Sequence, residues 1–421
     1  MKKRVVIIGG GFGGINLAKA LRKTYEFHVT LVDKNNYNFF PPLLYQVATG
    51  FLEPSSISYP FRTFFSGREN VTFWMGELLE IVPSENKVIL SNGEIEYDFL
   101  VMATGTKTNF FGLENIEKYA IPMKTLDDAL TMRNTLLERI EVATKCKDEA
   151  EREELLTMVI AGGGPTGVEI SGVLAEMSKS IIQKEYPELK NTRASIYLVN
   201  GADRLLVPMS EKSQSYTLDA IKSLGVKVLL NTRVVDYDGE RVYFKDGNYL
   251  RSKNLIWATG VTAITFKGIA AEYYERGNRL KVNEYNKVEG FNNIYAIGDT
   301  CIQYTDEDFP LGHPQLAQVA IQQGKMLAKN LQRIDQGNAP LPFRYTDKGS
   351  MAIIGKTKAV ADIPKPRIHL QGFVAWMIWL FVHLFSLINR HDQLRTFYNW
   401  SIDYFSKNQD LRMIIRPEKN S

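Results

Sequence analysis

The sequence contains two glycine-rich stretches with the residue types and spacing to bind phosphate groups. The first is Gly9-x-Gly11-x-x-Gly14 and the second is Gly162-x-Gly164-x-x-Gly167. In such a motif the first glycine permits a tight turn, the second lets backbone N–H groups approach a pyrophosphate, and the third lets a helix pack on a strand. The spacing is informative only when a strand precedes it and a helix follows.

The elements expected around both stretches are those that a dinucleotide site needs. Residues 5–8 are an unbroken β-branched run, typical of a buried parallel strand, and we expect a helix over 13–23 and a strand over 29–32. Residues 158–160, 167–177 and 195–199 repeat this order. Asp33, at the end of the second strand, is placed to accept hydrogen bonds from ribose hydroxyls. Each stretch therefore predicts a dinucleotide site.

The residue equivalent to Asp33 in the second unit is Asn200. An acid there would favour NADH by binding the ribose 2′-hydroxyl and repelling a 2′-phosphate. Asn200 retains the hydrogen bond without the repulsion, and the neighbouring Arg204 can pair with a phosphate. We predict NADH, and NADPH stays open as the alternative.

Hydride transfer between two bound dinucleotides explains why one chain would carry both motifs. A flavin accepts a hydride from a nicotinamide and then releases electrons to another acceptor. Small-residue turns follow two further strands at Ala103-Thr104-Gly105 and Ala258-Thr259-Gly260, and Gly298-Asp299 ends a late strand with a carboxylate suited to flavin ribityl hydroxyls. We therefore predict FAD at the first loop and a nicotinamide cofactor at the second.

Gln318 and Gln322 lie four residues apart in a helix expected over 315–332, so they share one face. A quinone needs hydrogen-bond donors at its two carbonyl oxygens in an otherwise apolar slot, and two uncharged amides provide them. The alternative interpretation is a pair of surface glutamines.

The C-terminal part of the chain has the composition of a membrane-surface segment. Residues 372–388 are 17 residues without a formal charge, which is at the lower limit for spanning a bilayer, and basic residues flank them on both sides. From 365 to 421 there are eight Lys/Arg and four Asp/Glu, which equals the formal excess of +4 of the whole chain. We predict interfacial helices on a lipid bilayer surface, with a hydrophobic dimer interface or a single transmembrane span as alternatives.

Overall composition limits the other classes. A length of 421 residues indicates two or three domains, and 44% hydrophobic with 23% charged residues indicates a folded protein. The net charge of +4 is too small to indicate nucleic-acid binding. Cys146 and Cys301 are the only cysteines and form no C-x-x-C, so a disulfide framework is excluded and no metal site is predicted.

With these motifs the sequence resembles the flavoproteins with two dinucleotide-binding domains, which are pyridine nucleotide-disulfide oxidoreductase-like, and within them the type II NADH:quinone oxidoreductases. The resemblance covers nearly the whole chain, from the first loop through residues 39–46, 162–169 and 295–299. Its most specific part is Ala317-Gln318-Val319-Ala320-Ile321-Gln322, which is similar to the A-Q-x-A-x-Q quinone-site motif of that family. Asn200 departs from the family pattern.

The resemblance implies an α/β fold of two Rossmann-type domains and a C-terminal amphipathic helical membrane-anchoring segment. We expect an FAD-binding domain at 1–115 and 266–364, an NADH-binding domain at 116–265 and an attachment region at 365–421. The implied reaction transfers two electrons from NADH through FAD to a membrane quinone, either menaquinone or ubiquinone, without proton pumping.

Motifs and resemblance together assign the site residues. The expected FAD site is Gly9, Gly11, Gly13, Gly14, Asp33, Lys34, Tyr45, Gln46, Thr104, Gly105, Gly298, Asp299 and Gln318; the expected NADH site is Gly162, Gly164, Pro165, Thr166, Gly167, Glu169, Asn200 and Gly260. The expected catalytic set is Glu169, Gln318 and Gln322. Glu169 lies on the first turn of its predicted helix, where the macrodipole favours an acid, and by resemblance it is a candidate for handling protons near the nicotinamide and the quinone.

Other classes remain as alternatives at this stage. Disulfide reductases and sulfide:quinone oxidoreductases need paired cysteines beside the flavin, and for Cys301 we expect the role of a packed thiol. A reductase linked to NADPH or sulfide, or a non-catalytic NADH-binding membrane protein, would keep the same fold. With a strand starting at Val5 we expect no targeting extension, and hence a bacterial protein at the cytoplasmic face of the cell membrane. Separately, we expect a homodimer.

Overall fold

The computed structural model describes residues 2–179, 183–192, 194–387, 389–406 and 413–414. They fall into two compact units, unit 1 within 1–39, 58–107 and 261–347, and unit 2 within 40–57, 108–260 and 348–421. Residues 40–57 and 348–364, which we expected in the FAD-binding domain, belong to unit 2. Of the expected attachment region 365–421, residues 388, 407–412 and 415–421 lie outside the described part.

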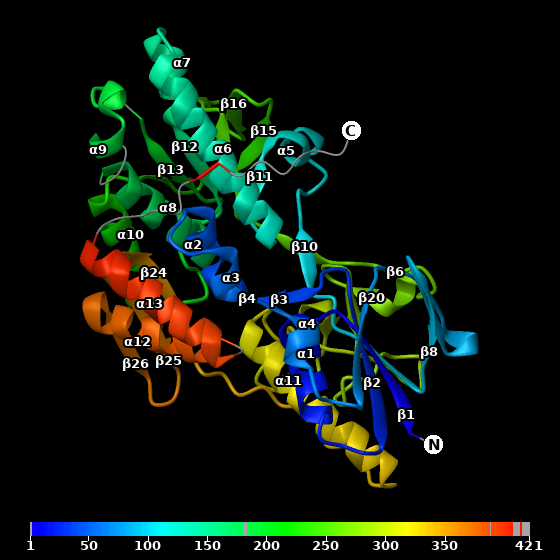
Figure 1. The fold of residues 1–421 in the computed structure, drawn as a ribbon. Helices are drawn as coiled ribbons and strands as arrows, with labels where there is room; N and C mark the ends of the chain where they lie inside the picture. The colour runs from blue at the N-terminus through cyan, green and yellow to red at the C-terminus, as the bar shows by residue number, and fades with distance from the viewer. Residues whose placement is uncertain (1, 180–182, 193, 388, 407–412, 415–421) are drawn as a thin grey trace. The chain divides into compact units, whose positions relative to one another are not determined.

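Unit 1 is built on a five-stranded parallel sheet with the strand order β22-β9-β1-β2-β5. These strands are β1 (Lys3–Ile8), β2 (Phe27–Asp33), β5 (Val71–Met75), β9 (Phe99–Met102) and β22 (Ile294–Ala296). Helices α1 (Phe12–Leu21) and α11 (Ala317–Asp335) pack side by side (Figure 1). A Cβ on Gly324 would lie 2.6 Å from the carbonyl oxygen of Gly13, so glycines at this crossing permit the close approach.

Smaller elements complete unit 1. They are β3 (Tyr37–Phe39), β4 (Ser58–Pro60), α4 (Phe61–Phe64), β6 (Leu78–Val82), β7 (Lys87–Leu90), β8 (Gly93–Glu96), β19 (Val261–Ala263), β20 (Tyr274–Glu275), β21 (Arg279–Lys281) and β23 (Cys301–Ile302), with 3₁₀ turns at Pro83–Glu85, Ala271–Tyr273 and Gly298–Thr300. Strand β10 (Thr106–Thr108) ends this part of the chain.

Unit 2 repeats the design around a parallel sheet with the strand order β11-β18-β12-β13-β14. Its strands are β11 (Ile121–Pro122), β12 (Met158–Ala161), β13 (Ile196–Val199), β14 (Lys227–Leu229) and β18 (Asn254–Trp257). A smaller sheet, which is antiparallel, consists of β15 (Val234–Tyr237), β16 (Arg241–Phe244) and β17 (Tyr249–Arg251). Its helices before the C-terminal part are α2 (Leu44–Ala48), α3 (Pro54–Ile57), α5 (Glu114–Tyr119), α6 (Leu126–Lys145), α7 (Glu149–Leu156), α8 (Pro165–Met177), α9 (Gln183–Glu185) and α10 (Glu211–Ser223), with 3₁₀ turns at Pro41–Leu43 and Pro187–Leu189. The expected α/β class is confirmed.

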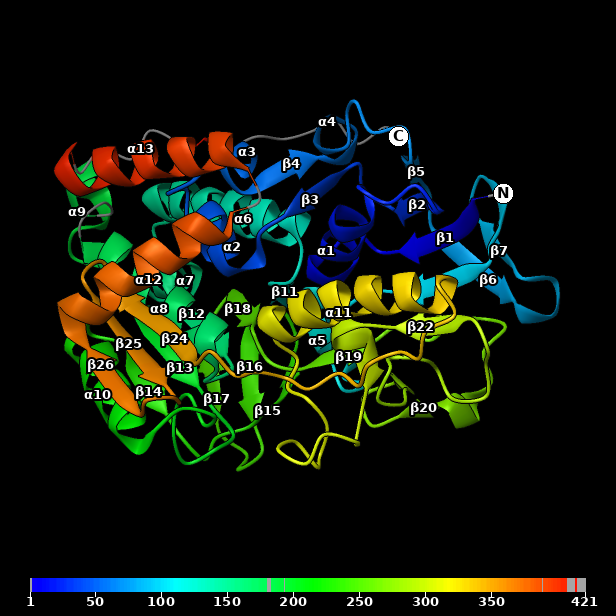
Figure 2. The ribbon, with the colours of Figure 1, turned by 90° about the horizontal axis from the view of Figure 1, so that it is seen from below.

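The C-terminal part of unit 2 is an antiparallel sheet followed by two helices, the first of which packs on the sheet. Strands β24 (Ser350–Gly355), β25 (Lys358–Ile363) and β26 (Ile368–Gln371) precede α12 (Gly372–Ser386) and α13 (Arg390–Ser406). Figure 2 shows α12 lying across β25 and β26, with α13 beside it. Among the described residues, no helix is both long enough and apolar enough to cross a membrane.

Candidate functional site

The first glycine loop joins β1 to α1 and leaves the start of the helix open. Gly9 has a φ of +104°, and a Cβ there would lie 2.4 Å from the carbonyl oxygen of Ala103. A Cβ on Gly14 would lie 1.9 Å from the Gly9 oxygen, so only glycine lets the helix pack on the turn. A Cβ on Gly11 would meet nothing within 4 Å. The free space at Gly11 fits a pyrophosphate at the helix N-terminus.

The second loop, between β12 and α8, has the same geometry. Gly162 has a φ of +122°, and its Cβ would lie 2.6 Å from the oxygen of Ala258. A Cβ on Gly167 would lie 1.8 Å from the Gly162 oxygen, whereas one on Gly164 would meet nothing within 4 Å. Two loops with one geometry fit two dinucleotides.

Asp33 and Asn200 make equivalent contacts with these loops. Asp33 Oδ2 accepts a hydrogen bond of 2.7 Å from Gly10 N, and Asn200 Oδ1 accepts one of 3.1 Å from Gly163 N. Burial raises the pKa of Asp33, although two backbone N–H groups and Lys34 act in the opposite direction. Asn200 carries no charge, so the second loop lacks the repulsion that an acid would exert on a 2′-phosphate.

The remaining residues assigned to the two loops are either exposed or tightly packed. Lys34, Pro165 and Thr166 are exposed. A Cβ on Gly13 would lie 3.2 Å from the side chain of Ile297, which makes packing its role. Gly260 has a φ of +75°, and its Cβ would lie 2.4 Å from Phe111.

Two further residues hold the late strand end, and the sequence interpretation missed both. The Gly298 N–H donates a 2.6 Å hydrogen bond to Oε1 of the buried Gln323. The buried Thr300 hydroxyl lies 3.2 Å from that of Thr104 and accepts a 2.8 Å bond from Gly105 N. These contacts fix the backbone beside Asp299. Gln323 follows Gln322 directly, so the only signal in the sequence was a further glutamine beside the predicted pair.

Gln318 and Gln322 both lie on α11 and are half-buried. The Gln322 amide makes two backbone hydrogen bonds: its Nε2 donates to Thr346 O at 2.9 Å, and its Oε1 accepts from Thr346 N at 3.0 Å. The amide nitrogen carries two hydrogens and this contact uses one of them, so the other can donate to a further group. Gln322 therefore anchors residue 346 to α11 whether or not it also contacts an acceptor.

Glu169 is the fifth residue of α8, not part of its first turn, because Pro165 begins the helix two residues earlier than we expected. The helix-start interpretation of this acid is therefore wrong. Burial raises the pKa of Glu169 to about 8, although a hydrogen bond from the Ile353 backbone acts to lower it. A carboxyl group with this pKa can hold and release a proton near neutral pH.

Tyr45 and Gln46 lie on α2 in a buried aromatic cluster of unit 2. Gln46 Nε2 donates a 2.9 Å hydrogen bond to the Tyr45 hydroxyl, and Gln46 Oε1 accepts one of 2.7 Å from Trp400 Nε1. The rings of Trp379 and His383 stack with their centroids 3.9 Å apart. Burial lowers the pKa of His383 to about 4, so this imidazole is neutral. The cluster is uncharged at neutral pH.

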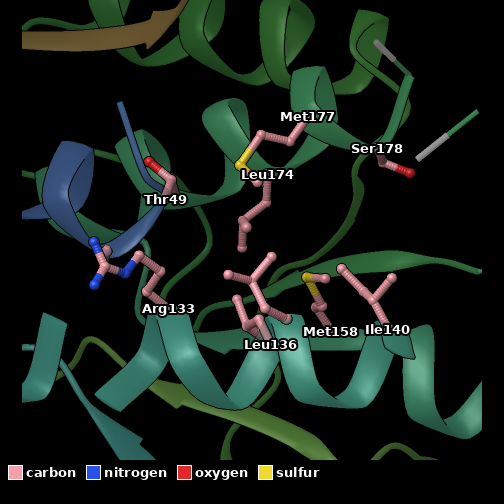
Figure 3. Close-up of a pocket in the computed structure, with 10 residues that line it drawn as sticks. Thr49, Arg133, Leu136, Ile140, Met158, Leu174, Met177 and Ser178 are labelled. Atoms are coloured by element: carbon pink, nitrogen blue, oxygen red, sulfur yellow. The ribbon is translucent and has the colours of Figure 1, made fainter. Parts of the chain in front are cut away.

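A small cavity lies between α2, α6 and α8, and Figure 3 shows its lining. Its volume is about 20 Å³, and apolar side chains such as Leu136, Ile140 and Leu174 dominate its walls. Arg133 extends from α6 toward the turn that carries Thr49. This volume has room for about one water molecule, so the cavity cannot hold a cofactor.

The cysteines offer no redox pair. Cys301 is buried in the core of unit 1, where burial raises the pKa of its thiol to about 12, and Cys146 is the other free cysteine. The expected packed thiol at Cys301 is confirmed. Among the described residues, no cluster of three or more potential ligands could hold a metal ion.

Family comparisons agree with this geometry. Residues 3–324 match the family described as pyridine nucleotide-disulphide oxidoreductase, and residues 348–408 match the one described as NDH2 C-terminal domain. The fold and the two loops thus define the chain as a member of the pyridine nucleotide-disulphide oxidoreductase class.

Individual relatives narrow the class. The type II NADH:quinone oxidoreductase Ndh of Mycobacterium tuberculosis is 32% identical over 420 residues, which cover 96% of this chain and 89% of that protein. The type II NADH:quinone oxidoreductase of Haemophilus influenzae is 29% identical, over 86% and 87% of the two chains. The chain belongs to the type II NADH:quinone oxidoreductase family, as its motifs predicted.

Solved structures share the fold. The NDH2 of Plasmodium falciparum in complex with NADH has a TM-score of 0.89 at 23% identity, over 99% of this chain and 100% of that chain. The sulfide:quinone oxidoreductase of Aquifex aeolicus has a TM-score of 0.74 at 21% identity, over 96% of both chains.

Proposed function

We propose that this chain transfers two electrons from NADH through FAD to a membrane quinone, without pumping protons. The observation that supports this most is the repetition of one open loop geometry in two units, at Gly11 and at Gly164. Unit 1 would hold FAD with the first loop, Asp33, and the backbone from Thr104 to Gly105 and from Gly298 to Asp299. Unit 2 would hold NADH with the second loop and Asn200. Bound FAD accepts a hydride and releases electrons to another acceptor.

The acceptor is a quinone such as menaquinone or ubiquinone. In this proposal Gln318 donates a hydrogen bond to the quinone and Gln322 holds residue 346 in place. By the family resemblance, Tyr45 and Gln46 are proposed to line the acceptor side. Glu169 supplies a proton, because a carboxyl group with a pKa of about 8 is largely protonated at neutral pH. Quinol formation takes up two protons, so a nearby acid speeds it.

NADPH is a second candidate donor, and Asn200 is the observation that favours it. Arg204 neighbours Asn200, whose Nδ2 donates to Arg204 O at 2.8 Å. A Cβ on Gly201 would lie 3.8 Å from Arg233 Nε, so a second guanidinium is close. A neutral amide with two arginines nearby does not repel a 2′-phosphate, although the Arg204 guanidinium is already paired with Asp203 at 3.0 Å.

The exposed side of α12 supports attachment to a lipid bilayer surface. Phe373, Val374, Met377, Phe381 and Phe385 are 49% to 64% exposed on a helix without formal charges. Exposed apolar side chains gathered on one helix are typical of a surface that binds a membrane or another protein. We place the protein on the cytoplasmic face of a bacterial membrane, as a homodimer.

One titration tests the reaction. The purified holoprotein is mixed with NADH under anaerobic conditions while the flavin absorbance is followed, and a short-chain quinone is then added. We expect bleaching by NADH and recovery of the band with quinone. A flavin band that NADH leaves unchanged would exclude the enzyme, and a band that no quinone restores would exclude the acceptor. A parallel run with NADPH ranks the two donors.

A further inference from the structure

Helix α13 makes more contacts than a membrane anchor needs. Its Leu394 and Tyr398 are 71% and 64% exposed, which suits a lipid surface. Its opposite side forms polar contacts with the chain around α2 and α3: Thr396 Oγ1 donates to Ser56 O at 3.1 Å, and Trp400 Nε1 donates to Gln46 Oε1 at 2.7 Å. Only the exposed side is needed for attachment. The buried side fixes a particular register of α13 against residues 46–56.

The bond from Trp400 determines how the Gln46 amide is oriented. An indole N–H can only donate, so the atom facing it must be the amide oxygen. The amide nitrogen then faces Tyr45, where it donates a 2.9 Å bond to the hydroxyl oxygen. Gln46 is 7% exposed, so water has little access to reorient its amide.

With the Gln46 amide in this orientation, the hydrogen of the Tyr45 hydroxyl is available for donation. Tyr45 is 3% exposed, and its oxygen already accepts from Gln46. Among the residues that the structure describes, none accepts a hydrogen bond from this hydroxyl. A buried hydroxyl group can donate as well as accept, so this hydrogen can be donated to a bound ligand. A ligand with a carbonyl oxygen would complete the chain of bonds.

The geometry points to Trp400 as a positioning residue of the acceptor site: through Gln46 it orients the Tyr45 hydroxyl to donate a hydrogen bond to a carbonyl oxygen of the quinone. This rests on the proposed function, in which Tyr45 lines the acceptor slot. It gives the C-terminal segment a second role. Helix α13 takes part in quinone reduction even when the quinone is water-soluble and no membrane is present.

The test replaces Trp400 by Phe in the full-length holoprotein, which keeps an aromatic ring and removes the N–H. Both half-reactions are followed by stopped flow, with a water-soluble short-chain quinone in detergent. Flavin reduction by NADH should stay within about twofold, and reoxidation should slow about 5- to 10-fold, as expected for one misdirected hydrogen bond. Equilibrium binding of the same quinone, measured by calorimetry, should weaken by a similar factor.

A matched control comes from unit 1. Trp74 Nε1 donates a 2.9 Å bond to the amide oxygen of Asn92, so Trp74→Phe removes the same type of bond elsewhere. It should change neither half-reaction. Tyr45→Phe should slow reoxidation as much as Trp400→Phe, and the double variant should be no slower than either single variant, because both act through one chain of bonds.

Three outcomes would overturn the inference while leaving the proposed function intact: unchanged reoxidation in Trp400→Phe, additive effects in the double variant, or equal slowing of both half-reactions. A wild-type flavin that no quinone reoxidises would instead overturn the proposed function. Thermal unfolding of each variant separates these results from loss of the fold.

Discussion

Asp33 and Asn200 make the same contact with two copies of one loop and differ by a charge. Each accepts a hydrogen bond from the N–H of the residue after the loop's first glycine. The contact therefore stabilises the loop in both units. The charge, which only Asp33 carries, is the difference that can discriminate between ligands. For the first loop the acid suits ribose hydroxyls. For the second, the neutral amide exerts no repulsion on a 2′-phosphate, so we expect it to discriminate less between NADH and NADPH.

Asn200→Asp should increase the preference for NADH over NADPH. The variant keeps the acceptor oxygen for Gly163 N and adds a negative charge that repels a 2′-phosphate. We expect kcat/KM for NADPH to fall about tenfold or more, with NADH changed by no more than about threefold. Steady-state kinetics with both donors measure this. An equal loss with both donors would show that the substitution only disturbs the loop.

Glu169 should make stability depend on pH. Its pKa is raised from about 4.5 to about 8 in the folded state, so the folded protein binds this proton more tightly than the unfolded chain. The stabilising contribution is complete below about pH 4.5 and is lost as the pH rises through about 8. At about 1.4 kcal/mol per pKa unit, its upper bound is about 5 kcal/mol.

Glu169→Gln removes this proton linkage while keeping the size of the side chain. The melting temperature of the wild type relative to Glu169→Gln should therefore fall steadily from pH 5 to pH 8. Melting curves of both proteins across that range provide the measurement, and parallel curves would mean that Glu169 ionises normally.

At the scale of elements, each loop contains glycines required for tight packing and one glycine beside open space. A Cβ on Gly167 would lie 1.8 Å from the Gly162 oxygen, so α8 would have to move away from β12. Gly164 has ordinary extended angles, with φ at −77°, and open space around it. The structure thus separates two functions that the G-x-G-x-x-G pattern combines.

Alanine substitutions should separate these two functions. Gly167→Ala should lower stability by about 1 to 3 kcal/mol, the usual effect of forcing extra volume into a packed site. Gly164→Ala should leave the melting temperature and flavin content unchanged and raise the KM for NADH about tenfold, because its methyl group occupies the space that the pyrophosphate needs. If Gly164→Ala instead melts early with a normal KM, the open space is not the cofactor site.

For the whole molecule, the sequence predicted what depends on neighbouring residues and missed what depends on distant ones. The loops, their strands and the glutamine spacing are local patterns, and they indicated the fold and the family. The membership of 40–57 in unit 2 is not local, nor is the packing of β24 on α8, where a Cβ on Gly172 would lie 2.1 Å from Ile354 O. The pairing of Gln322 with Thr346 joins residues 24 positions apart and gave no signal in the sequence.

The packing of the C-terminal part also decides how membrane attachment should be tested. Trp379 is fully buried, and α12 packs on β25, so truncating the chain before α12 would damage unit 2 and not only an anchor. Substitutions on the exposed side avoid this. Phe381 and Phe385 are 64% and 61% exposed, and their rings lie 4.5 Å apart.

Phe381→Glu with Phe385→Glu should detach the protein from lipid without unfolding it. Each Phe that enters the bilayer interface contributes about 1.5 kcal/mol or more, so binding to anionic vesicles should weaken at least about 100-fold. Flavin content and turnover with a water-soluble quinone should be retained, because neither side chain belongs to the proposed acceptor cluster.

Met75→Glu with Leu79→Glu is the matched control: both residues are 52% to 53% exposed in unit 1, so the same charges are added away from α12. If the α12 variant still co-sediments with vesicles but changes from dimer to monomer in ultracentrifugation, the exposed side is a subunit interface. If both double variants lose vesicle binding equally, net charge drives attachment and the apolar side of α12 does not.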